Sequence, residues 1–215
     1  MKGLKHYLAN APACRQAGEG AARTLSMFGL PREIVVFDTE YTSWEGAKER
    51  GWGNPGEHKE VVQIGALTLD TDTLAETSSL LLLVKPVKNP LLSDYFTKLT
   101  GISQEEGDRD GLSYEAALSR FGRWGRGLPL FCWGDDVEVM EGNAKLLGIP
   151  FPFPADGESD IKNVFKARGI PAEHYYSSTI PRAFGEEPPP HAHDALNDAR
   201  SIAQGLRALA RVSPQ

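Results

Sequence analysis

The chain has 215 residues, of which 40% are hydrophobic and 24% charged, and its formal net charge is −6. This length and composition are typical of one globular domain with a sizeable core. The acidic charge disfavours coating of nucleic acid by the whole surface, but it is compatible with a local cleft that metal ions neutralise. No apolar run approaches the roughly 18 residues of a membrane span and the start lacks a secretory pattern, so we expect a cytoplasmic protein without membrane contact.

The first half of the chain is expected to supply an appendage and most of a sheet. Residues 1–31 carry Ala, Gly and scattered charge with a weak helical rhythm, and we expect them to precede a domain that spans 32–215. The run 34–37 consists of branched and aromatic residues, which is typical of a strand buried on both faces. After a long connection rich in Gly, Pro and charge, further strands are predicted at 61–70 and 80–84.

The second half is expected to be mostly helical. Short and longer helices are predicted at 93–96 and 113–124, separated by a Gly and Asp cluster, and a fourth strand at 129–133. Apolar residues at helical spacing then predict a helix that ends at Gly148, a shorter one at 161–167 and a last one over about 196–209. This order predicts an α/β fold with a mixed β-sheet flanked by helices.

Two acidic residues follow the first predicted strand directly. Because side chains alternate between the faces of a strand, Asp38 and Glu40 lie on the same side of it. Two carboxylates this close repel each other unless a cation lies between them. The pair indicates a metal site if further ligands join it, although acids are also common where a strand enters solvent.

A second cluster, from His193 to Asp198, opens the last predicted helix. On an α-helix two residues five apart point about 140° away from each other, so His193 must precede the helix if it shares a site with Asp198. Asp194 is then expected at the N-cap, with Asp198 one turn inside. The alternative is that these aspartates only cap the helix and balance its dipole.

A third candidate is the pair Asp135 and Asp136, where the fourth strand ends and a helix begins. At about 100° per residue, the apolar stripe of this helix has its centre roughly 60° from Asp136 and roughly 160° from Asp135. The helix phase therefore favours Asp136 as the carboxylate that faces the protein body. Asp135 is expected to be the N-cap, which is the common role of an aspartate at this place.

Taken in chain order, a strand-end Asp-x-Glu, a strand-to-helix Asp and a His-x4-Asp resemble the DEDDh subgroup of the DnaQ-like 3′–5′ exonucleases. The resemblance covers about residues 34–209. It includes the segments 40–46, 62–66 and 99–104, which are similar to the branch that contains KapD-like and histone-mRNA exonucleases. It implies a ribonuclease H-like mixed β-sheet flanked by α-helices.

The resemblance also implies a two-metal mechanism. Asp38, Glu40, Asp136 and Asp198 would hold two divalent cations, Mg²⁺ or Mn²⁺, which prefer hard oxygen ligands. One ion helps to activate the attacking water and the other stabilises the leaving 3′ oxygen, while His193 takes the proton of the water. The expected activity is release of nucleoside 5′-monophosphates from the 3′ ends of single-stranded RNA or DNA.

Substrate contacts are expected beside the acidic pair and in one later segment. Thr39, Tyr41 and Trp44 adjoin the acids, and the two aromatic rings can either stack on terminal bases or belong to the core. Leu99 and Ile102 lie in the segment that lines the 3′-nucleotide pocket in the resembling family, although apolar residues are more often simply buried.

Two alternatives compete with this interpretation, and the residues disfavour the first. The string His191, His193 and Asp194 superficially suggests a transition-metal hydrolase, but the other histidines are scattered without ligand spacing. The second alternative is a binding or regulatory module that keeps the exonuclease fold without its activity, although all five expected side chains are present.

Overall fold

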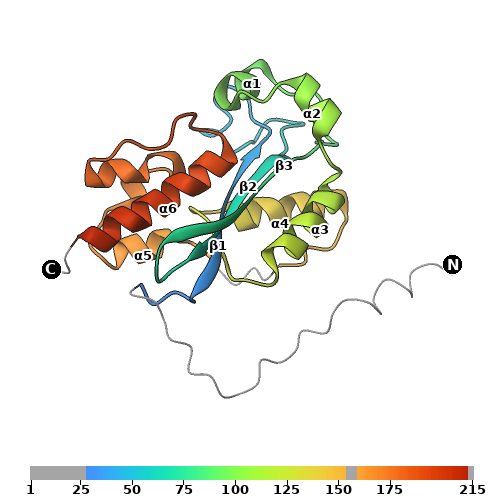
Figure 1. The fold of residues 1–215 in the computed structure, drawn as a ribbon. Helices are drawn as coiled ribbons and strands as arrows, with labels where there is room; N and C mark the ends of the chain where they lie inside the picture. The colour runs from blue at the N-terminus through green and yellow to red at the C-terminus, as the bar shows by residue number, and fades with distance from the viewer. Residues whose placement is uncertain (1–27, 154–158, 213–215) are drawn as a thin grey trace.

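The computed structural model describes residues 28–153 and 159–212, and its centre is a four-stranded sheet in the order β3-β2-β1-β4 (Figure 1). The strands β1 (Glu33–Tyr41), β2 (Val61–Asp70) and β3 (Ala75–Leu83) form antiparallel pairs, whereas β4 (Leu130–Phe131) is parallel to β1. The mixed sheet predicted from the sequence is therefore confirmed.

Helices cover both faces of the sheet (Figure 1). The helices α3 (Tyr114–Gly125) and α4 (Asp136–Leu147) pack on one face, and α6 (Ala195–Arg211) packs on the other. The other helices are α1 (Asp94–Thr100), α2 (Gln104–Asp110) and α5 (Lys162–Lys166), with the 3₁₀ segments η1 (Ala172–His174) and η2 (Ser177–Phe184). Among the described residues no helix is both long and apolar enough to cross a membrane.

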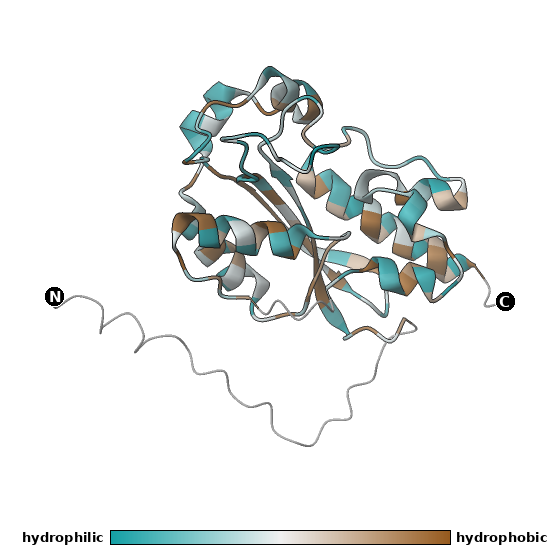
Figure 2. Ribbon diagram, turned by 180° about the vertical axis from the view of Figure 1, so that it is seen from behind, coloured by the Kyte–Doolittle hydropathy of each residue, from teal (hydrophilic) through white to brown (hydrophobic). Residues whose placement is uncertain are grey.

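The two faces of β1 belong to two different hydrophobic clusters. Val35 and Phe37 pack with residues of α3 and α4, whereas Ile34 and Val36 pack with residues of α6. This division follows from the alternation of side chains along a strand. Figure 2 shows the corresponding pattern, with hydrophobic residues concentrated along the strands and interleaved with hydrophilic ones along the helices.

The helix α6 is amphipathic, as its sequence predicts. Ala199, Ile202, Ala203, Leu206 and Leu209 recur at helical spacing and are at most 2% exposed. Fully burying an aliphatic side chain of the size of leucine contributes roughly 1.5–3 kcal/mol. This stripe therefore holds α6 firmly on the sheet, which fixes the position of its first turn.

Several strand boundaries differ from the expected ones. β1 continues four residues beyond 34–37 because residues 38–41 also pair with β2. β3 begins at Ala75 rather than at 80, since its polar first half pairs with β2 while exposed on the surface. β4 is confined to Leu130–Phe131, and an isolated parallel bridge between Cys132 and Asp160 continues the sheet beyond it. Backbone pairing thus extends strands past their apolar runs.

The helix α2 overlaps the Gly and Asp cluster that the sequence predicts as a connection between two helices. Its first turn carries a capping box, in which Ser103 and Glu106 satisfy each other's backbone N–H groups. This signal was present in the sequence, but the glycine and aspartate residues of α2 are poor helix formers and hid it.

The last part of the expected appendage packs on the domain. Leu30 is buried in the cluster on the α6 face, and the carbonyl oxygen of Pro31 accepts a hydrogen bond from the Thr71 hydroxyl at 2.8 Å. Residues 1–27, in which a weak helical rhythm was noted, lie outside the described residues.

Candidate metal centre

The first two carboxylates lie on the face of β1 that α6 covers. Asp38 and Glu40 continue the series of Ile34 and Val36 along that face, and both are less than 9% exposed. In the register of the sheet, Gly65 of β2 lies opposite Asp38 and Gln63 lies opposite Glu40. The acids are therefore enclosed between the sheet and the start of α6.

Gly65 allows the first turn of α6 to rest directly on β2. A Cβ atom at this position would lie 2.0 Å from the backbone nitrogen of Leu196 and 2.2 Å from the carbonyl carbon of Ala195. Beside it, the side-chain oxygen of Gln63 accepts a hydrogen bond from the backbone N–H of Ala195 at 2.8 Å. Both contacts place the start of α6 over Asp38 and Glu40.

Gly65→Ala is therefore expected to destabilise the protein by about 3 kcal/mol or more, because the new methyl group overlaps backbone that cannot rotate away. Chemical denaturation measures this loss, and nuclease activity should fall with it. Gly142→Ala is the matched control: this residue lies inside α4 with nothing within 4 Å of the added Cβ, so the same change should stabilise by up to about 1 kcal/mol. Equal stability of the two variants would contradict the close approach.

The segment before α6 adopts the arrangement that its sequence predicts. Asp194 is the N-cap, and its side chain accepts a hydrogen bond from the Asn197 N–H at 3.0 Å. His193 precedes the helix with a left-handed φ of 65°, and its backbone N–H donates to the Asp198 carboxylate at 3.3 Å. Side-chain atoms of Glu40, His193 and Asp198 consequently lie within 4.8 Å of one another.

Asp136 lies at the start of α4, on the other face of the sheet, and is close enough to Asp38 and Glu40 to raise their pKa. Since β1 and β4 are parallel, the segment from the end of β4 to Asp136 runs beside the end of β1. The Asp136 carboxylate is buried and accepts two hydrogen bonds from Thr39, from its N–H at 3.1 Å and from its hydroxyl at 2.5 Å. Thr39, expected to contact substrate, is thus a direct partner of Asp136.

The neighbouring Asp135 points into solvent. Its side chain is 72% exposed and lies 3.7 Å from the Lys59 ammonium group. It occupies the N-cap position of α4, but its side chain makes no capping hydrogen bond. The helix phase read from the sequence is therefore confirmed, while the expected capping hydrogen bond is not formed.

Burial raises the pKa of all four carboxyl groups, and repulsion from neighbouring carboxylates adds to it. The pKa of Asp38 is well above its usual value, first because of burial and then because of Asp136, Asp198 and Glu40; a hydrogen bond from the Ser177 hydroxyl acts in the opposite direction. Burial followed by the charges of Asp198 and Asp136 likewise raises the pKa of Glu40.

The other two carboxyl groups respond to the same forces. Burial raises the pKa of Asp136 to about 7 against the hydrogen bonds from Thr39. Burial also raises the pKa of Asp198 to about 7 against the N–H of His193.

None of the four carboxylates forms an ion pair with a lysine or arginine in the part of the chain that the structure describes. Such a set of oxygen ligands suits a hard divalent cation, which would supply the missing positive charge.

The imidazole of His193 is shifted in the other direction. Burial, and then the charge of Lys48, lower its pKa below 6.5. The lowered pKa favours the neutral ring, which is the form that can accept a proton. His191 also has a left-handed backbone but is exposed and does not belong to the cluster of Glu40, His193 and Asp198, so the string of His191, His193 and Asp194 does not form a shared metal site.

The expected aromatic contacts lie beside the acids. The ring of Tyr41 is half-buried, with its centre 5.4 Å from that of Trp52 and 5.3 Å from the Lys59 nitrogen. Trp44 is also half-buried, and its carbonyl oxygen accepts the N–H of Ala47 in the loop after β1. Both residues are thus only partly exposed, and Tyr41 also packs against the hydrophobic cluster on the α3 and α4 face.

The two apolar residues of the later segment differ in exposure. Leu99 is half-buried in α1, whereas Ile102 is only 6% exposed and packs with Val62 and Phe96 in a small cluster of its own. The side chain of Ser93, which caps α1, donates to the carbonyl oxygen of Ser43 at 2.5 Å. This contact joins α1 to the loop that follows β1.

Gln63, Gly65 and Ser177 contribute to the site although the sequence assigned them no role. A glycine inside a strand does signal close approach of another backbone, but it does not say which one. Gln63 and Ser177 carry no such signal, because their partners in α6 and β1 are far away in the chain.

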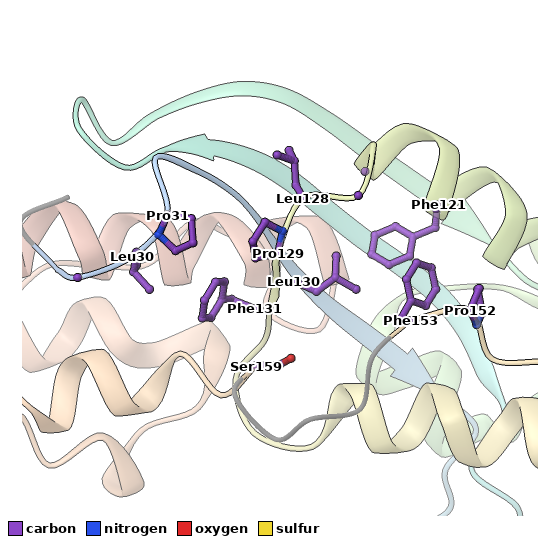
Figure 3. Close-up of a pocket in the computed structure, with 14 residues that line it drawn as sticks. Leu30, Pro31, Phe121, Leu128, Pro129, Leu130, Phe131, Pro152, Phe153 and Ser159 are labelled. Atoms are coloured by element: carbon purple, nitrogen blue, oxygen red, sulfur yellow. The ribbon is translucent and has the colours of Figure 1, made fainter. Parts of the chain in front are cut away.

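A separate apolar cavity of about 740 Å³ lies where β1 and β4 begin, at the end of β1 opposite to the acids (Figure 3). Leu30, Phe121, Leu130 and Phe153 are among the residues that line it, and none of the acidic residues described above does. An apolar lining offers no groups for acid–base or metal chemistry, so the candidate site is the carboxylate cluster.

The mixed sheet, with four buried carboxylates and a histidine gathered around the end of β1, is the arrangement that the DEDDh motifs imply. A family model described as Exonuclease (RNase_T) matches residues 35–206. The chain belongs to this 3′–5′ exonuclease family, as its motifs indicate.

Two curated relatives are similar over part of the chain. ERI1 exoribonuclease 2 of Homo sapiens is 30% identical over 125 residues, which cover 57% of this chain and 16% of the relative. ERI1 exoribonuclease 2 of Xenopus laevis is 31% identical over 91 residues, which cover 42% and 12%. This chain thus matches only a small part of the length of these relatives.

Solved structures confirm the ribonuclease H-like fold. The nuclease domain of 3′hExo, a DEDDh family member bound to rAMP, has a TM-score of 0.69 and 23% identity, with 83% of this chain and 92% of that chain covered. A 3′-exonuclease in a structure of histone mRNA stem-loop recognition has a TM-score of 0.67 and 22% identity, with 83% and 63% covered.

Proposed function

We propose that this chain is a metal-dependent exonuclease that removes nucleoside 5′-monophosphates from the 3′ ends of single-stranded RNA or DNA. The observation that carries this proposal is a cluster of four buried carboxylates that have no ion-pair partner among the described residues and lie close enough to raise one another's pKa. Two of them, Glu40 and Asp198, lie within 4.8 Å of His193. Such a cluster is costly unless cations bind it, and membership of the exonuclease family supplies the reaction that bound cations would serve.

The metal ligands are Asp38, Glu40, Asp136 and Asp198, which would hold two Mg²⁺ or Mn²⁺ ions. Bound there, the ions would lower the pKa of the attacking water and neutralise the charge that grows on the phosphate. The chain itself fixes the ligands: Thr39 orients Asp136, and the N–H of His193 orients Asp198.

His193 is the general base in this proposal. Its neutral imidazole lies beside Glu40 and Asp198, on the loop that leads into α6, where it accepts the proton of the water that attacks the terminal phosphodiester. The left-handed backbone of His193 allows its N–H and its ring to serve the same site.

His193→Ala is expected to lower kcat by roughly 10²- to 10⁴-fold, the usual effect of losing a general base. Metal affinity, measured by titration calorimetry, should be largely kept. The exposed His191→Ala is the matched control and should retain activity. A loss of metal affinity as large as that in Asp198→Ala would instead make His193 a ligand.

The substrate contacts remain those expected from the sequence. Tyr41 and Trp44, both partly exposed in and after the end of β1, would stack on terminal bases. Thr39 adjoins the ligand Asp136, and Leu99 and Ile102 would form the apolar wall of the nucleotide pocket. The solved relatives were captured with rAMP and with a histone mRNA stem-loop, which makes RNA the first substrate to test.

The direction of digestion tests the proposal. A single-stranded oligonucleotide blocked by a 3′-phosphate should be degraded poorly, whereas an unblocked one is shortened from its 3′ end. Matched RNA and DNA strands compared in the same assay identify the preferred sugar. Cuts in a circular single strand would reveal an endonuclease, and metal-induced thermal stabilisation without any cleavage would reveal a binding module.

A further inference from the structure

Two segments beside the candidate metal centre meet through a cation–aromatic contact. Lys48 lies in the loop after β1, and Tyr176 directly precedes η2. The ammonium nitrogen of Lys48 lies 4.3 Å from the centre of the Tyr176 ring. Tyr176 is 61% exposed, which is unusual for a large aromatic side chain.

This contact adjoins the catalytic groups. Lys48 lies close enough to His193 for its charge to lower the pKa of the imidazole. Ser177, the residue after Tyr176, donates a hydrogen bond to the Asp38 carboxylate. The lysine and the tyrosine are therefore next to the proposed base and the first proposed metal ligand.

Lys48 differs from Lys59 in whether a carboxylate neutralises its charge. The Lys59 ammonium also lies over an aromatic ring, 4.4 Å from the centre of Trp52, but it pairs with Asp135 at 3.7 Å. Lys48 has no carboxylate at ion-pair distance within the described ranges 28–153 and 159–212. Its charge is thus available to a ligand, as is the uncovered part of the Tyr176 ring.

An exposed ring beside an uncompensated ammonium group matches the chemistry of a nucleotide. A base of any identity can stack on the ring, while the ammonium neutralises a phosphate. We propose that Lys48 and Tyr176 form a subsite for a nucleotide upstream of the scissile phosphate in a single-stranded nucleic acid. This inference rests on the proposed function, since the scissile phosphate is placed at the metal centre.

Binding measurements test the subsite without requiring cleavage. The probes are a fluorescently labelled single-stranded oligonucleotide and a nucleoside 5′-monophosphate, which is too short to reach from the metal centre to the subsite. Both are titrated in Ca²⁺, a hard cation that suits the same oxygen ligands. Tyr176→Ala should weaken oligonucleotide binding at least about fivefold more than mononucleotide binding, and Tyr176→Phe should restore it.

Lys48→Met should weaken oligonucleotide binding and reduce its dependence on salt, because one phosphate contact is lost. Lys166→Met, which removes an exposed lysine from α5, is the control for net charge and should leave both properties unchanged. Equal effects of Tyr176→Ala on both probes, or no effect on either, would overturn the subsite. An oligonucleotide that binds through Tyr176 but is never cleaved would overturn the proposed function and leave the subsite standing.

Discussion

Asp38→Asn is expected to abolish nuclease activity while the fold is kept, and Glu40→Gln should do the same. Each change removes one negative charge from a cluster whose function is to bind cations, and neither creates a cavity. Activity measured over a range of Mg²⁺ and Mn²⁺ concentrations should stay at background, and circular dichroism should show an intact fold. Undiminished turnover in either variant would remove the metal site.

The same variants should be more stable than the parent protein in the absence of metal. Asp136 and Asp198 have folded pKa values of about 7, above their ordinary value of 3.8. Their contribution to stability is present below pH of about 4 and is lost as the pH rises through about 7. The unfolding free energy of the metal-free protein should therefore fall over this range, and less steeply in Asp38→Asn.

Added Mg²⁺ should reverse this order. A cation that binds only the folded parent stabilises it, by about 2.7 kcal/mol at a concentration of 100 times Kd, whereas Asp38→Asn gains much less. Denaturant titrations of both proteins at two pH values, each with and without metal, measure these unfolding free energies. A metal-free parent protein that became more stable toward alkaline pH would contradict the clustered geometry of the carboxylates.

Asp136→Asn is expected to abolish turnover, in contrast to Asp135→Asn. Asp136 is buried and held by Thr39 toward the other carboxylates, so its charge belongs to the metal site. Asp135 is exposed and makes only a surface ion pair with Lys59, so its replacement should cost at most about 1 kcal/mol of stability. Parallel kcat measurements and denaturation curves compare the two neighbours.

The pair of variants also carries its own control. Asparagine can still accept the hydrogen bonds from Thr39, so Asp136→Asn tests the charge and not the packing. Since Asp135 makes no capping hydrogen bond, its replacement leaves the start of α4 in place. Full activity in Asp136→Asn together with inactivity in Asp135→Asn would mean that the third metal ligand had been misassigned.

Local periodicity predicted much of the site. Alternation along a strand placed Asp38 and Glu40 together, and the angle per residue of a helix separated Asp136 from Asp135. The same geometry required His193 to precede α6, where it lies. These predictions succeed because each depends on only a few bonds along the backbone.

Contacts between distant segments could not be predicted in the same way. The position of Gly65 opposite Asp38 depends on the register between two strands, and register follows from the packing of the whole sheet. The hydrogen bond from the Ala195 N–H to Gln63 depends on how α6 packs on β2. The approach of Lys48 to Tyr176 depends on how two segments far apart in the chain are placed. The length of β1 was underestimated for the same reason, because β2 pairs with its polar end.

The most direct test of the account is digestion of a 5′-labelled single-stranded oligonucleotide with Mg²⁺ and with a chelator. With Mg²⁺ we expect a ladder of progressively shorter labelled fragments, and with the chelator an intact strand. A parallel preparation of Asp38→Asn should leave the strand intact under both conditions. Release of the labelled mononucleotide as the first product would contradict digestion from the 3′ end. A ladder that persists in the chelator or in Asp38→Asn would contradict the dependence on metal.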